Sequence, residues 1–273
     1  MDRYAVMGNP IGHSLSPLIH KAFAEETNQL LLYSSILVEA GEFPLEVSRF
    51  FAAGGKGLNI TVPFKKEAWE LADNLSAEAN LAGAVNTLLK DQEGKLQGHN
   101  TDGLGLIRDI KSNYNCIIEG KKILVMGAGG ATRGILLPLL RERPESVCIV
   151  NRTLSKAEEL AQLFSKYGAV SACGYDELSA GEAKKMDWII NASSASLQGE
   201  LPPMPGNILS SDAVCYDLMY AQDETVFCQW AQGAGAMKVM NGLGMLVEQA
   251  AESFYLWRGI RPTTQKIIQG LRK

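Results

Sequence analysis

Residues 121–134 read KKILVMGAGGATRG, an apolar run that leads directly into a glycine-rich turn. The run predicts a buried β-strand, and the apolar spacing after the turn predicts a helix and then another strand at 146–151. In such a unit, Gly127 makes the tight turn and Gly129 lets the backbone approach a pyrophosphate at the helix N-terminus. Thr132 replaces the third glycine of the usual pattern, so a plain βα turn is the alternative. The strand–turn–helix–strand context favours a dinucleotide site.

The end of the second strand carries an arginine where such sites usually have an acid. In IVNRTLSK, residues 149–156, this place is taken by Asn151 and Arg152. A carboxylate here would bind a ribose diol and repel a 2′-phosphate, whereas a guanidinium pairs with phosphate and stacks on adenine. Thr153 and Lys156 add a hydroxyl donor and a second positive charge, and Asn151 keeps a neutral partner for the ribose. The alternative is that these basic residues are solvated charges at a helix start. Their position favours NADP over NAD.

Composition limits the class of protein. The chain has 273 residues, of which 46% are hydrophobic and 21% charged, with a formal net charge of −4, values of a globular protein of one or two domains. The charge argues against a nucleic-acid binder with a broadly basic face. There is no secretory pattern and no run near the ~18 apolar residues of a membrane span. Five scattered cysteines fit reduced thiols in the cytoplasm, and three histidines without ligand spacing predict no metal site.

The chain alternates strand and helix patterns, with a break near residue 102. Before the break, we expect strands at 3–8, 31–38 and 57–64, helices at 16–28, 42–55 and 65–75, and a hairpin at 84–100 that turns at Asp91–Gly94. After it, we expect helices at 101–110, 130–142, 154–164 and 242–259 and strands at 121–127, 146–151, 186–193 and 213–220. This order predicts an α/β protein with two mostly parallel sheets covered by helices.

Eight short blocks, taken together, carry a family resemblance. They are GNPIGHSLSP, GGKGLNITVPFK, LAGAVNT, GHNTDG, GAGGATRG, NRT, YDLMY and NGLGMLVEQA, in this order from residue 8 to about 259. In these blocks the chain resembles the shikimate dehydrogenase family. The resemblance implies an oxidoreductase that oxidises shikimate reversibly to 3-dehydroshikimate with NADP. In cells that family runs mainly towards reduction, within chorismate and aromatic amino acid biosynthesis.

The resemblance also implies the site residues. Ser14 and Ser16 match carboxylate-binding serines, although Ser16 on its own could simply cap a helix at Pro17. Residues that match contacts to the ring hydroxyls are Thr61, Lys65, Asn86, Asp102 and Gln249, and Tyr220 matches a further substrate contact. Residues that match the cofactor site are Gly127, Ala128, Gly129, Gly130, Ala131, Asn151, Arg152, Thr153, Lys156, Met219 and Gly242.

The chemistry needs a base, because hydride leaves a carbinol carbon only as the hydroxyl proton is removed. Lys65 and Asp102 are the candidates that match the family. Lysines are nearly all protonated at neutral pH, so a lysine base requires surroundings that favour the neutral amine. Our hypothesis is that Lys65 transfers the proton and that Asp102 orients both Lys65 and the hydroxyl. The reverse assignment, with Asp102 as the proton-transfer group, stays open.

Some positions depart from the family pattern, and two other functions compete. The segment after Asn191, the residue after Tyr220 and Asn241 differ from the residues common in the family. A quinate/shikimate dehydrogenase with NAD is one competitor, but such relatives tend to carry an acid soon after Asn-Arg, and residues 153–156 contain none. A non-catalytic NADP sensor would not need both Lys65 and Asp102.

The resemblance also predicts the domain organisation. Gln249 belongs to the substrate group, whereas the glycine turn and Arg152 belong to the cofactor group. We therefore expect a substrate domain of residues 1–101 plus 240–273 and a Rossmann-like NADP domain of residues 102–239, with substrate and nicotinamide in the cleft between them. Whether the protein is a monomer or a homodimer is left open.

Overall fold

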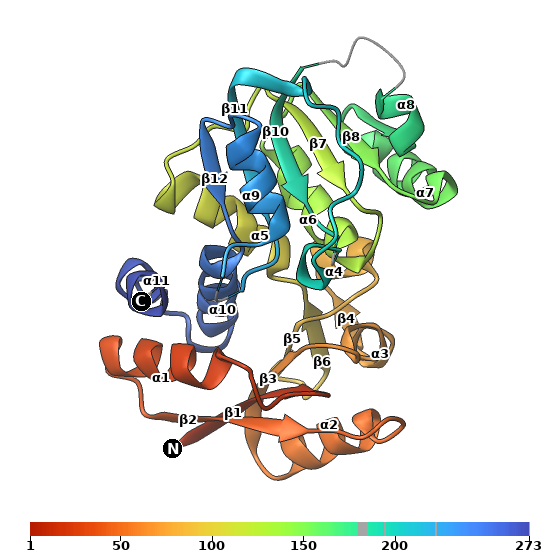
Figure 1. The fold of residues 1–273 in the computed structure, drawn as a ribbon. Helices are drawn as coiled ribbons and strands as arrows, with labels where there is room; N and C mark the ends of the chain where they lie inside the picture. The colour runs from red at the N-terminus through yellow and green to blue at the C-terminus, as the bar shows by residue number, and fades with distance from the viewer. Residues whose placement is uncertain (180–184, 194, 222, 273) are drawn as a thin grey trace. The chain divides into compact units, whose positions relative to one another are not determined.

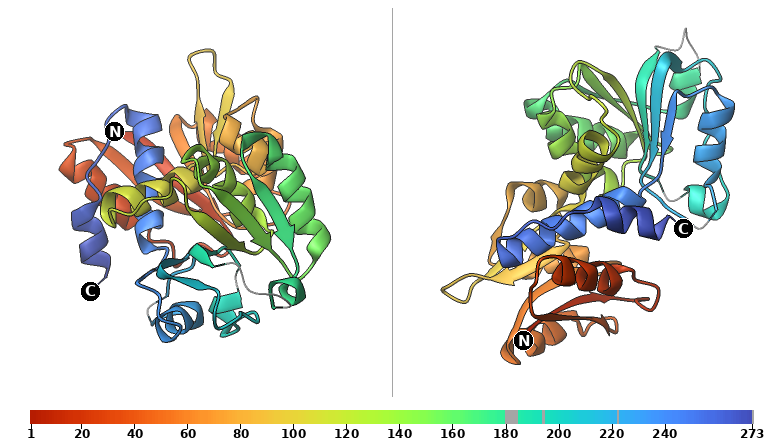
Figure 2. Two further views of the ribbon diagram at one scale, coloured as in Figure 1. Left: turned by 90° about the horizontal axis from the view of Figure 1, so that it is seen from above. Right: turned by 90° about the vertical axis from the view of Figure 1, so that its left-hand side faces the viewer.

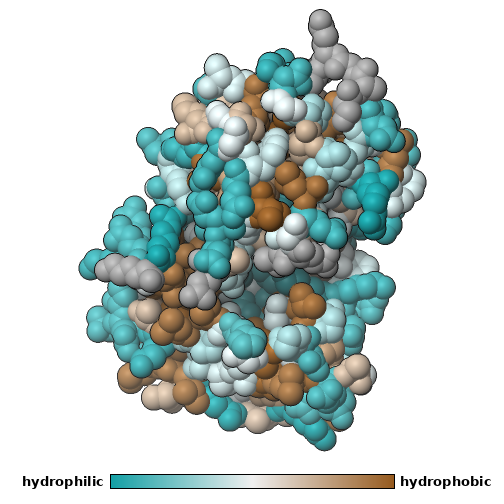
Figure 3. All heavy atoms as spheres, in the orientation of Figure 1, coloured by the Kyte–Doolittle hydropathy of each residue, from teal (hydrophilic) through white to brown (hydrophobic). Residues whose placement is uncertain are grey.

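The computed structural model describes residues 1–179, 185–193, 195–221 and 223–272 (Figure 1). The chain forms two compact units: a first unit of Met1–Arg108 with Leu246–Lys273, and a second unit of Asp109–Met245. The chain therefore changes units at 108/109 and 245/246, where the sequence predicted 101/102 and 239/240. Figure 3 shows that polar side chains cover much of the visible face of each unit, with apolar ones scattered among them.

The first unit is built on a mixed six-stranded sheet. Its strands are β1 (Asp2–Gly8), β2 (Leu31–Leu37), β3 (Gly55–Ile60), β4 (Asn74–Leu75), β5 (Thr87–Lys90) and β6 (Leu96–His99), in the order β2-β1-β3-β5-β6-β4. The pairs β1–β2, β1–β3 and β4–β6 are parallel, and β5 runs antiparallel to both neighbours. Its helices are α1 (Ser16–Glu26), α2 (Phe43–Ala52), α3 (Lys65–Leu71), α4 (Ala77–Ala82), α5 (Asp102–Arg108), α10 (Leu243–Arg258, from Leu246 on) and α11 (Gln265–Leu271).

Close packing of α10 on this sheet brings the end of the chain beside its beginning. Trp257 lies directly against Gly57 on β3, where a Cβ would collide with the indole ring, and its Nε1 donates to Leu88 O at 3.2 Å. Phe254 is fully buried with residues of α1. The apolar i, i+3, i+4 spacing that predicted this helix therefore marks its buried face, which packs against α1 and, at Trp257, against the sheet.

Two local predictions are wrong in detail, and the hairpin is confirmed. The helix expected at 65–75 ends at Leu71, because Asp73 exchanges hydrogen bonds with the backbone of Leu96 and the chain continues as β4. Ser16 does not cap α1, whose N-cap position is Leu15 and has no side-chain cap. The hairpin turns at Asp91–Gly94, with Gly94 N–H on Asp91 O at 3.1 Å and φ of +82°.

The second unit is an all-parallel sheet with helices on both faces. Its strands are β7 (Lys122–Met126), β8 (Ser146–Val150), β9 (Val170–Cys173), β10 (Met186–Asn191), β11 (Leu209–Asp217) and β12 (Lys238–Met240), in the order β12-β11-β10-β7-β8-β9. Its helices are η1 (Asp109–Asn113, π), α6 (Gly130–Arg141), α7 (Leu154–Phe164), η2 (Ser165–Tyr167), α8 (Tyr175–Ser179), η3 (Ala195–Gln198) and α9 (Val226–Gly233). Figure 2 (right) shows α6 and α7 on one face of the sheet and α9 on the other.

The strand order of the second unit creates a position for a ligand at the carboxyl ends of its central strands. From β7 the chain proceeds to β8 on one side, and later returns to β10 on the other side. Ligands of open α/β sheets bind at this reversal, outside the carboxyl ends of the strands. Over the residues described, no helix is long and apolar enough to cross a membrane.

Candidate active site

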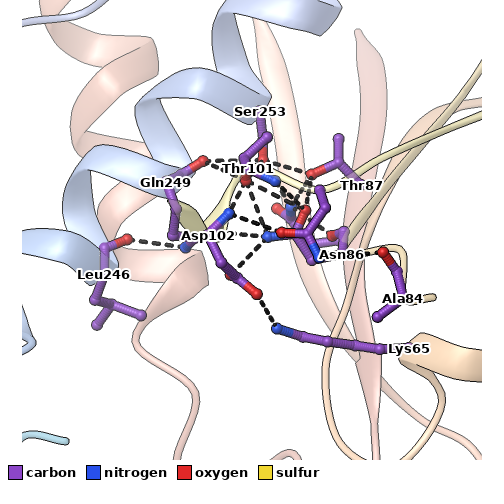
Figure 4. Close-up of polar contacts among 11 residues, drawn as sticks. Lys65, Ala84, Asn86, Thr87, Thr101, Asp102, Leu246, Gln249 and Ser253 are labelled. Atoms are coloured by element: carbon purple, nitrogen blue, oxygen red, sulfur yellow. Dashed lines mark hydrogen bonds and ion pairs between the residues drawn. The ribbon is translucent and has the colours of Figure 1, made fainter. Parts of the chain in front are cut away.

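Lys65 and Asp102 form the centre of a polar group in the first unit (Figure 4). Lys65 is the first residue of α3 and Asp102 the first of α5, and Lys65 Nζ lies 2.6 Å from Asp102 Oδ2. Their side chains are 33% and 19% exposed, so a ligand can still reach both. Asn86 Nδ2 donates to the second carboxylate oxygen at 2.8 Å. A cation, a carboxylate and an amide thus meet at one partly buried position.

The backbone around this centre fixes its geometry. Asn86 Oδ1 accepts the N–H of Thr101 at 3.0 Å, and Asn100 Oδ1 accepts the N–H of Asp102 at 3.1 Å. Asn86 also donates to Thr101 Oγ1 at 2.9 Å. The Asn86 side chain is therefore held by a main-chain N–H, and the backbone of Asp102 is held by the Asn100 side chain.

The other residues of the first unit that were predicted to bind substrate lie on three different segments. Thr61 follows β3 and accepts Phe64 N–H on its carbonyl at 3.0 Å. Gln249 on α10 donates to Leu246 O at 2.8 Å, and its Oε1 lies 3.4 Å from Asn86 Nδ2. Ser14 Oγ accepts the N–H of Ser16 at 3.3 Å in the loop before α1. The structure thus brings Gln249 to the Lys65 group, while Tyr220 belongs to the second unit.

A buried polar layer below Asn86 was not identified from the sequence. Asn59 on β3 donates to Asn86 O and Thr87 Oγ1, both at 3.2 Å, and accepts Tyr33 Oη at 2.8 Å. Ser253 on α10 lies 2.7 Å from Thr87 Oγ1. Asn59 and Ser253 each interrupt an otherwise apolar pattern, and that interruption was the available signal. This layer joins β3, β5 and α10 beneath the site.

The second unit has a cavity of about 800 Å³ at the carboxyl ends of its strands. Its walls are Gly127, Asn151, Arg152, Leu154, Gly174, Tyr175, Asp176, Glu177, Ser193, Ala195, Glu200, Leu201, Pro202 and Pro203. The cavity therefore joins the glycine turn to the strand end that carries the arginine. Among the residues described, no group of three or more His, Cys, Asp or Glu side chains could hold a metal ion.

The glycine turn has the shape that a pyrophosphate needs. Gly127 has φ of +100°, and a Cβ there would lie 3.4 Å from the backbone of Ala192. Beyond Gly129 and Gly130 the space is open, so a ligand can approach the backbone, and Ala128 and Ala131 beside them are half-buried. Thr132, at the position of the missing third glycine, is buried and donates to Gly127 O at 2.8 Å. The Thr132 hydroxyl therefore stabilises the turn through a buried hydrogen bond to its first glycine.

The strand end offers positive charge to a ligand. Arg152 is exposed, and its side chain makes no hydrogen bond or ion pair with any other described residue. Thr153 is the N-cap residue of α7 without a side-chain cap bond, and Lys156 is exposed on the first turn of the same helix. Asn151 Nδ2 donates to Thr153 O at 2.8 Å. The cavity, the open glycines and the unpaired guanidinium together fit NADP.

Met219 and Gly242 lie close together in the second unit. Gly242 N–H donates to Met219 O at 3.1 Å, and a Cβ on Gly242 would collide with Leu218 O. Only a glycine allows this approach of the two segments. The two residues expected near the nicotinamide are thus joined to each other through their backbones.

Three family models match the chain. They are the shikimate dehydrogenase substrate binding domain over residues 6–88, shikimate / quinate 5-dehydrogenase over 110–198, and the shikimate 5′-dehydrogenase C-terminal domain over 242–272. A shikimate dehydrogenase (NADP(+)) of Saccharophagus degradans is 53% identical over 276 residues, covering 100% of this chain and 99% of the relative.

Solved structures agree with these matches. The crystal structure of an Ael1 enzyme from Pseudomonas putida is similar at a TM-score of 0.95 and 43% identity, over 100% of this chain and 99% of the other. A shikimate 5-dehydrogenase from Thermus thermophilus, in complex with NADP(H) and shikimate, is similar at a TM-score of 0.86 and 31% identity, over 100% and 99% of the two chains. This chain belongs to the shikimate dehydrogenase family.

Proposed function

We propose that the protein is an NADP-dependent shikimate dehydrogenase, which interconverts shikimate and 3-dehydroshikimate in chorismate and aromatic amino acid biosynthesis. The observation that carries this function is the pairing of Lys65 with Asp102 at 2.6 Å, with Asn86 on the second carboxylate oxygen at 2.8 Å. This arrangement places a group that can exchange a proton beside a group that can hold it in position. A protein that only binds NADP has no need of it.

The proposed proton transfer uses Lys65, oriented by Asp102. Asp102 accepts from Lys65 on one oxygen and from Asn86 on the other, so each carboxylate oxygen has a partner before a substrate arrives. A hydroxyl bound between the two side chains can pass its proton to the neutral amine form of Lys65 as hydride leaves the same carbon. The geometry is equally compatible with Asp102 as the proton acceptor, and the variants in the Discussion separate the two assignments.

The remaining residues of the site hold the substrate. Ser14 and Ser16 supply hydroxyls for the carboxylate, and Thr61 and Gln249 supply hydrogen bonds to the ring hydroxyls. Tyr220 is a further contact, and burial raises the pKa of its phenol, which keeps it a donor at neutral pH. All these groups are neutral, so the substrate's single negative charge would be bound by hydrogen bonds.

The cofactor would be held by three parts of the second unit. Gly127 through Ala131 face the pyrophosphate, and Asn151 faces the adenosine ribose. Arg152, Thr153 and Lys156 bind the 2′-phosphate, and Met219 and Gly242 contact the nicotinamide. When bound, NADP⁺ accepts the hydride and NADPH returns it. An exposed, unpaired arginine is well suited to a doubly charged phosphate, since no internal ion pair must first be broken.

An absorbance assay of the reduced cofactor tests this function directly. Shikimate and quinate are each offered with NADP⁺ and with NAD⁺, and we expect turnover mainly with shikimate and NADP⁺. Quinate is included because one matching family model describes shikimate / quinate dehydrogenases. Turnover of quinate with NAD⁺ at a similar rate would favour the relaxed enzyme. Binding of NADPH without turnover of either substrate would leave only a sensor.

We further propose that the enzyme works in the cytoplasm, without a nucleic-acid or membrane partner, as a monomer or a homodimer. The five cysteines are all free thiols, which suits a reducing compartment. The net charge of −4 gives no basis for attraction to nucleic acid. Sedimentation velocity at micromolar concentration distinguishes monomer from homodimer.

A further inference from the structure

Asp217 is a fully buried carboxylate that belongs to neither the proposed substrate site nor the proposed cofactor site. It ends β11, directly beside Asn191 at the end of β10. Both residues lie at the carboxyl ends of the strands, where the cavity opens. Its Oδ1 accepts from Met219 N–H and from Asn191 Nδ2, both at 3.0 Å, and its Oδ2 accepts from Thr225 Oγ1 at 2.6 Å.

Each donor to Asp217 comes from a different segment. The bond to Met219 N–H spans two residues and forms an Asx turn, which fixes the backbone direction just after the strand. Thr225 caps helix α9 through the N–H of Cys228 at 3.3 Å. Asn191 connects Asp217 to the neighbouring strand. Removal of the carboxylate would therefore take an acceptor from Met219 N–H, from Thr225 Oγ1 and from one N–H of the Asn191 amide.

The two ends of the proposed cofactor site depend on Asp217 to different degrees. At the adenosine end, Asn191 Oδ1 accepts from Ser193 N–H and Oγ at 3.1 and 2.7 Å, and Ser193 lines the cavity. Asn191 has further anchors, because its carbonyl accepts Leu218 N–H at 2.9 Å and its Nδ2 also contacts Ser196. At the nicotinamide end, Asp217 holds the backbone of Met219 directly, and Met219 in turn accepts Gly242 N–H.

We propose that Asp217 is a positioning residue for the nicotinamide end of the cofactor site. It holds the Met219–Gly242 pair in the place where that pair contacts the nicotinamide, whereas the adenosine end keeps its geometry without Asp217. This inference rests on the proposed function, since it takes NADP as the ligand. Desolvation raises the pKa of Asp217, and the donors from Thr225, Met219, Ser196 and Asn191 oppose this shift. Hydrogen bonds from Asn191, Met219 and Thr225 to one buried carboxyl are what a fixed anchor requires.

The test compares a ligand that has no nicotinamide with the complete cofactor. Adenosine 2′,5′-bisphosphate occupies only the adenosine end, and its Kd is measured by calorimetry on the full-length enzyme. For Asp217→Ala, we expect this Kd to stay within about threefold of the native value. We expect kcat for shikimate to fall by about 10- to 100-fold, because a small displacement of a reacting group has such a cost. The fluorescence of bound NADPH, which comes from the nicotinamide, should change as well.

Two further variants of Asp217 and one control variant make the result specific. Asp217→Asn keeps an acceptor for Met219 N–H and should restore kcat and the fluorescence to near native values. Asp217→Ser keeps a weaker acceptor for Met219 N–H and should give an intermediate loss of kcat. This variant also serves as the test if Asp217→Ala does not fold. Asp187→Ala is the matched control, since Asp187 accepts Lys122 N–H at 2.8 Å at the opposite end of the same sheet. It should lower stability without any change in the fluorescence of bound NADPH.

The outcomes separate this inference from the function beneath it. If the native enzyme does not bind adenosine 2′,5′-bisphosphate, the proposed cofactor is wrong. If the native enzyme binds it, the positioning role would be overturned by an equal loss of affinity for adenosine 2′,5′-bisphosphate and for NADPH in Asp217→Ser and Asp217→Ala. Unchanged kcat and fluorescence in both variants would overturn it too.

Discussion

Asn59 Nδ2 lies 3.0 Å from Ser253 Oγ, so that β3 and α10 are joined by two buried side chains 194 positions apart. Ser253 Oγ also lies 2.7 Å from Thr87 Oγ1 and donates to Gln249 O at 3.1 Å. This one hydroxyl therefore joins α10 to strands β3 and β5, beneath the candidate active site. Both Asn59 and Ser253 are almost completely inaccessible to water.

Replacement of Ser253 by alanine should destabilise the protein. We expect Ser253→Ala to lower the free energy of unfolding by about 1–3 kcal/mol, because Asn59 and Thr87 each lose a partner that water cannot replace. Urea unfolding followed by circular dichroism measures this change. Ser165→Ala, at an exposed hydroxyl, should stay within about 0.5 kcal/mol of the native protein. Equal effects of the two variants would show that the buried layer contributes nothing.

Proton transfer by Lys65 predicts a loss in kcat. We expect Lys65→Ala to lower kcat for shikimate by about 10²- to 10⁴-fold, the usual contribution of a general base. The neighbouring Lys66 is the matched control, since it is exposed and forms an ion pair with Glu70 at 3.4 Å. Lys66→Ala should leave kcat unchanged. Steady-state kinetics with saturating NADP⁺ give both values.

The same experiment separates the two assignments of the proton acceptor. Asp102→Asn keeps the size of the side chain but removes its charge, so it should raise KM and lower kcat less than Lys65→Ala does. A greater loss of kcat in Asp102→Asn would assign the proton to Asp102. If Lys65→Ala retained most of kcat while substrate affinity collapsed, Lys65 would be a binding residue only.

Sequence patterns predicted the elements better than the side-chain network. The strand–turn–helix unit from Lys122 and the hairpin at Asp91–Gly94 depend on local spacing and turn chemistry, which a sequence displays directly. The 2.6 Å pair of Lys65 and Asp102 depends on how α3 and α5 meet, and only the family resemblance suggested it. Asn59, Asp217 and Ser253 carried no local sign of their partners, because those partners come from other elements.

Cofactor choice should depend on Arg152. We expect Arg152→Asp to lower kcat/KM for NADP⁺ by about 10- to 100-fold, since charge-assisted hydrogen bonds to a phosphate contribute about 1.5–3 kcal/mol. The KM for shikimate should change little, because Arg152 belongs to the cofactor cavity. Arg143→Asp makes the same charge change at a surface ion pair with Glu119 and should not alter the preference. An unchanged ratio of NADP⁺ to NAD⁺ use in Arg152→Asp would contradict the assignment.

His20 should make the first unit sensitive to acid. Its ring is fully buried and stacks on Tyr33 at 4.2 Å between centroids, and burial lowers its pKa from 6.5 to about 3, against a smaller opposing contribution from Asn59. Burial also raises the pKa of Tyr33, so its phenol stays neutral. Between pH 6.5 and 3 the unfolded chain binds a proton at His20 that the folded protein does not bind. The contribution of neutral His20 to the free energy of unfolding is therefore fully present above pH 6.5 and declines as the pH falls towards 3.

The variant His20→Phe isolates this effect. Between pH 7 and pH 5 the native protein should lose about 2 kcal/mol more of its free energy of unfolding than the variant does, from 1.36 kcal/mol per pH unit below 6.5. Any cost of the larger phenyl ring is the same at both pH values and cancels in the comparison. His13→Gln, at an exposed histidine, should retain the native pH dependence. Parallel unfolding curves of the native protein and His20→Phe across this range would show that His20 is protonated in the folded state.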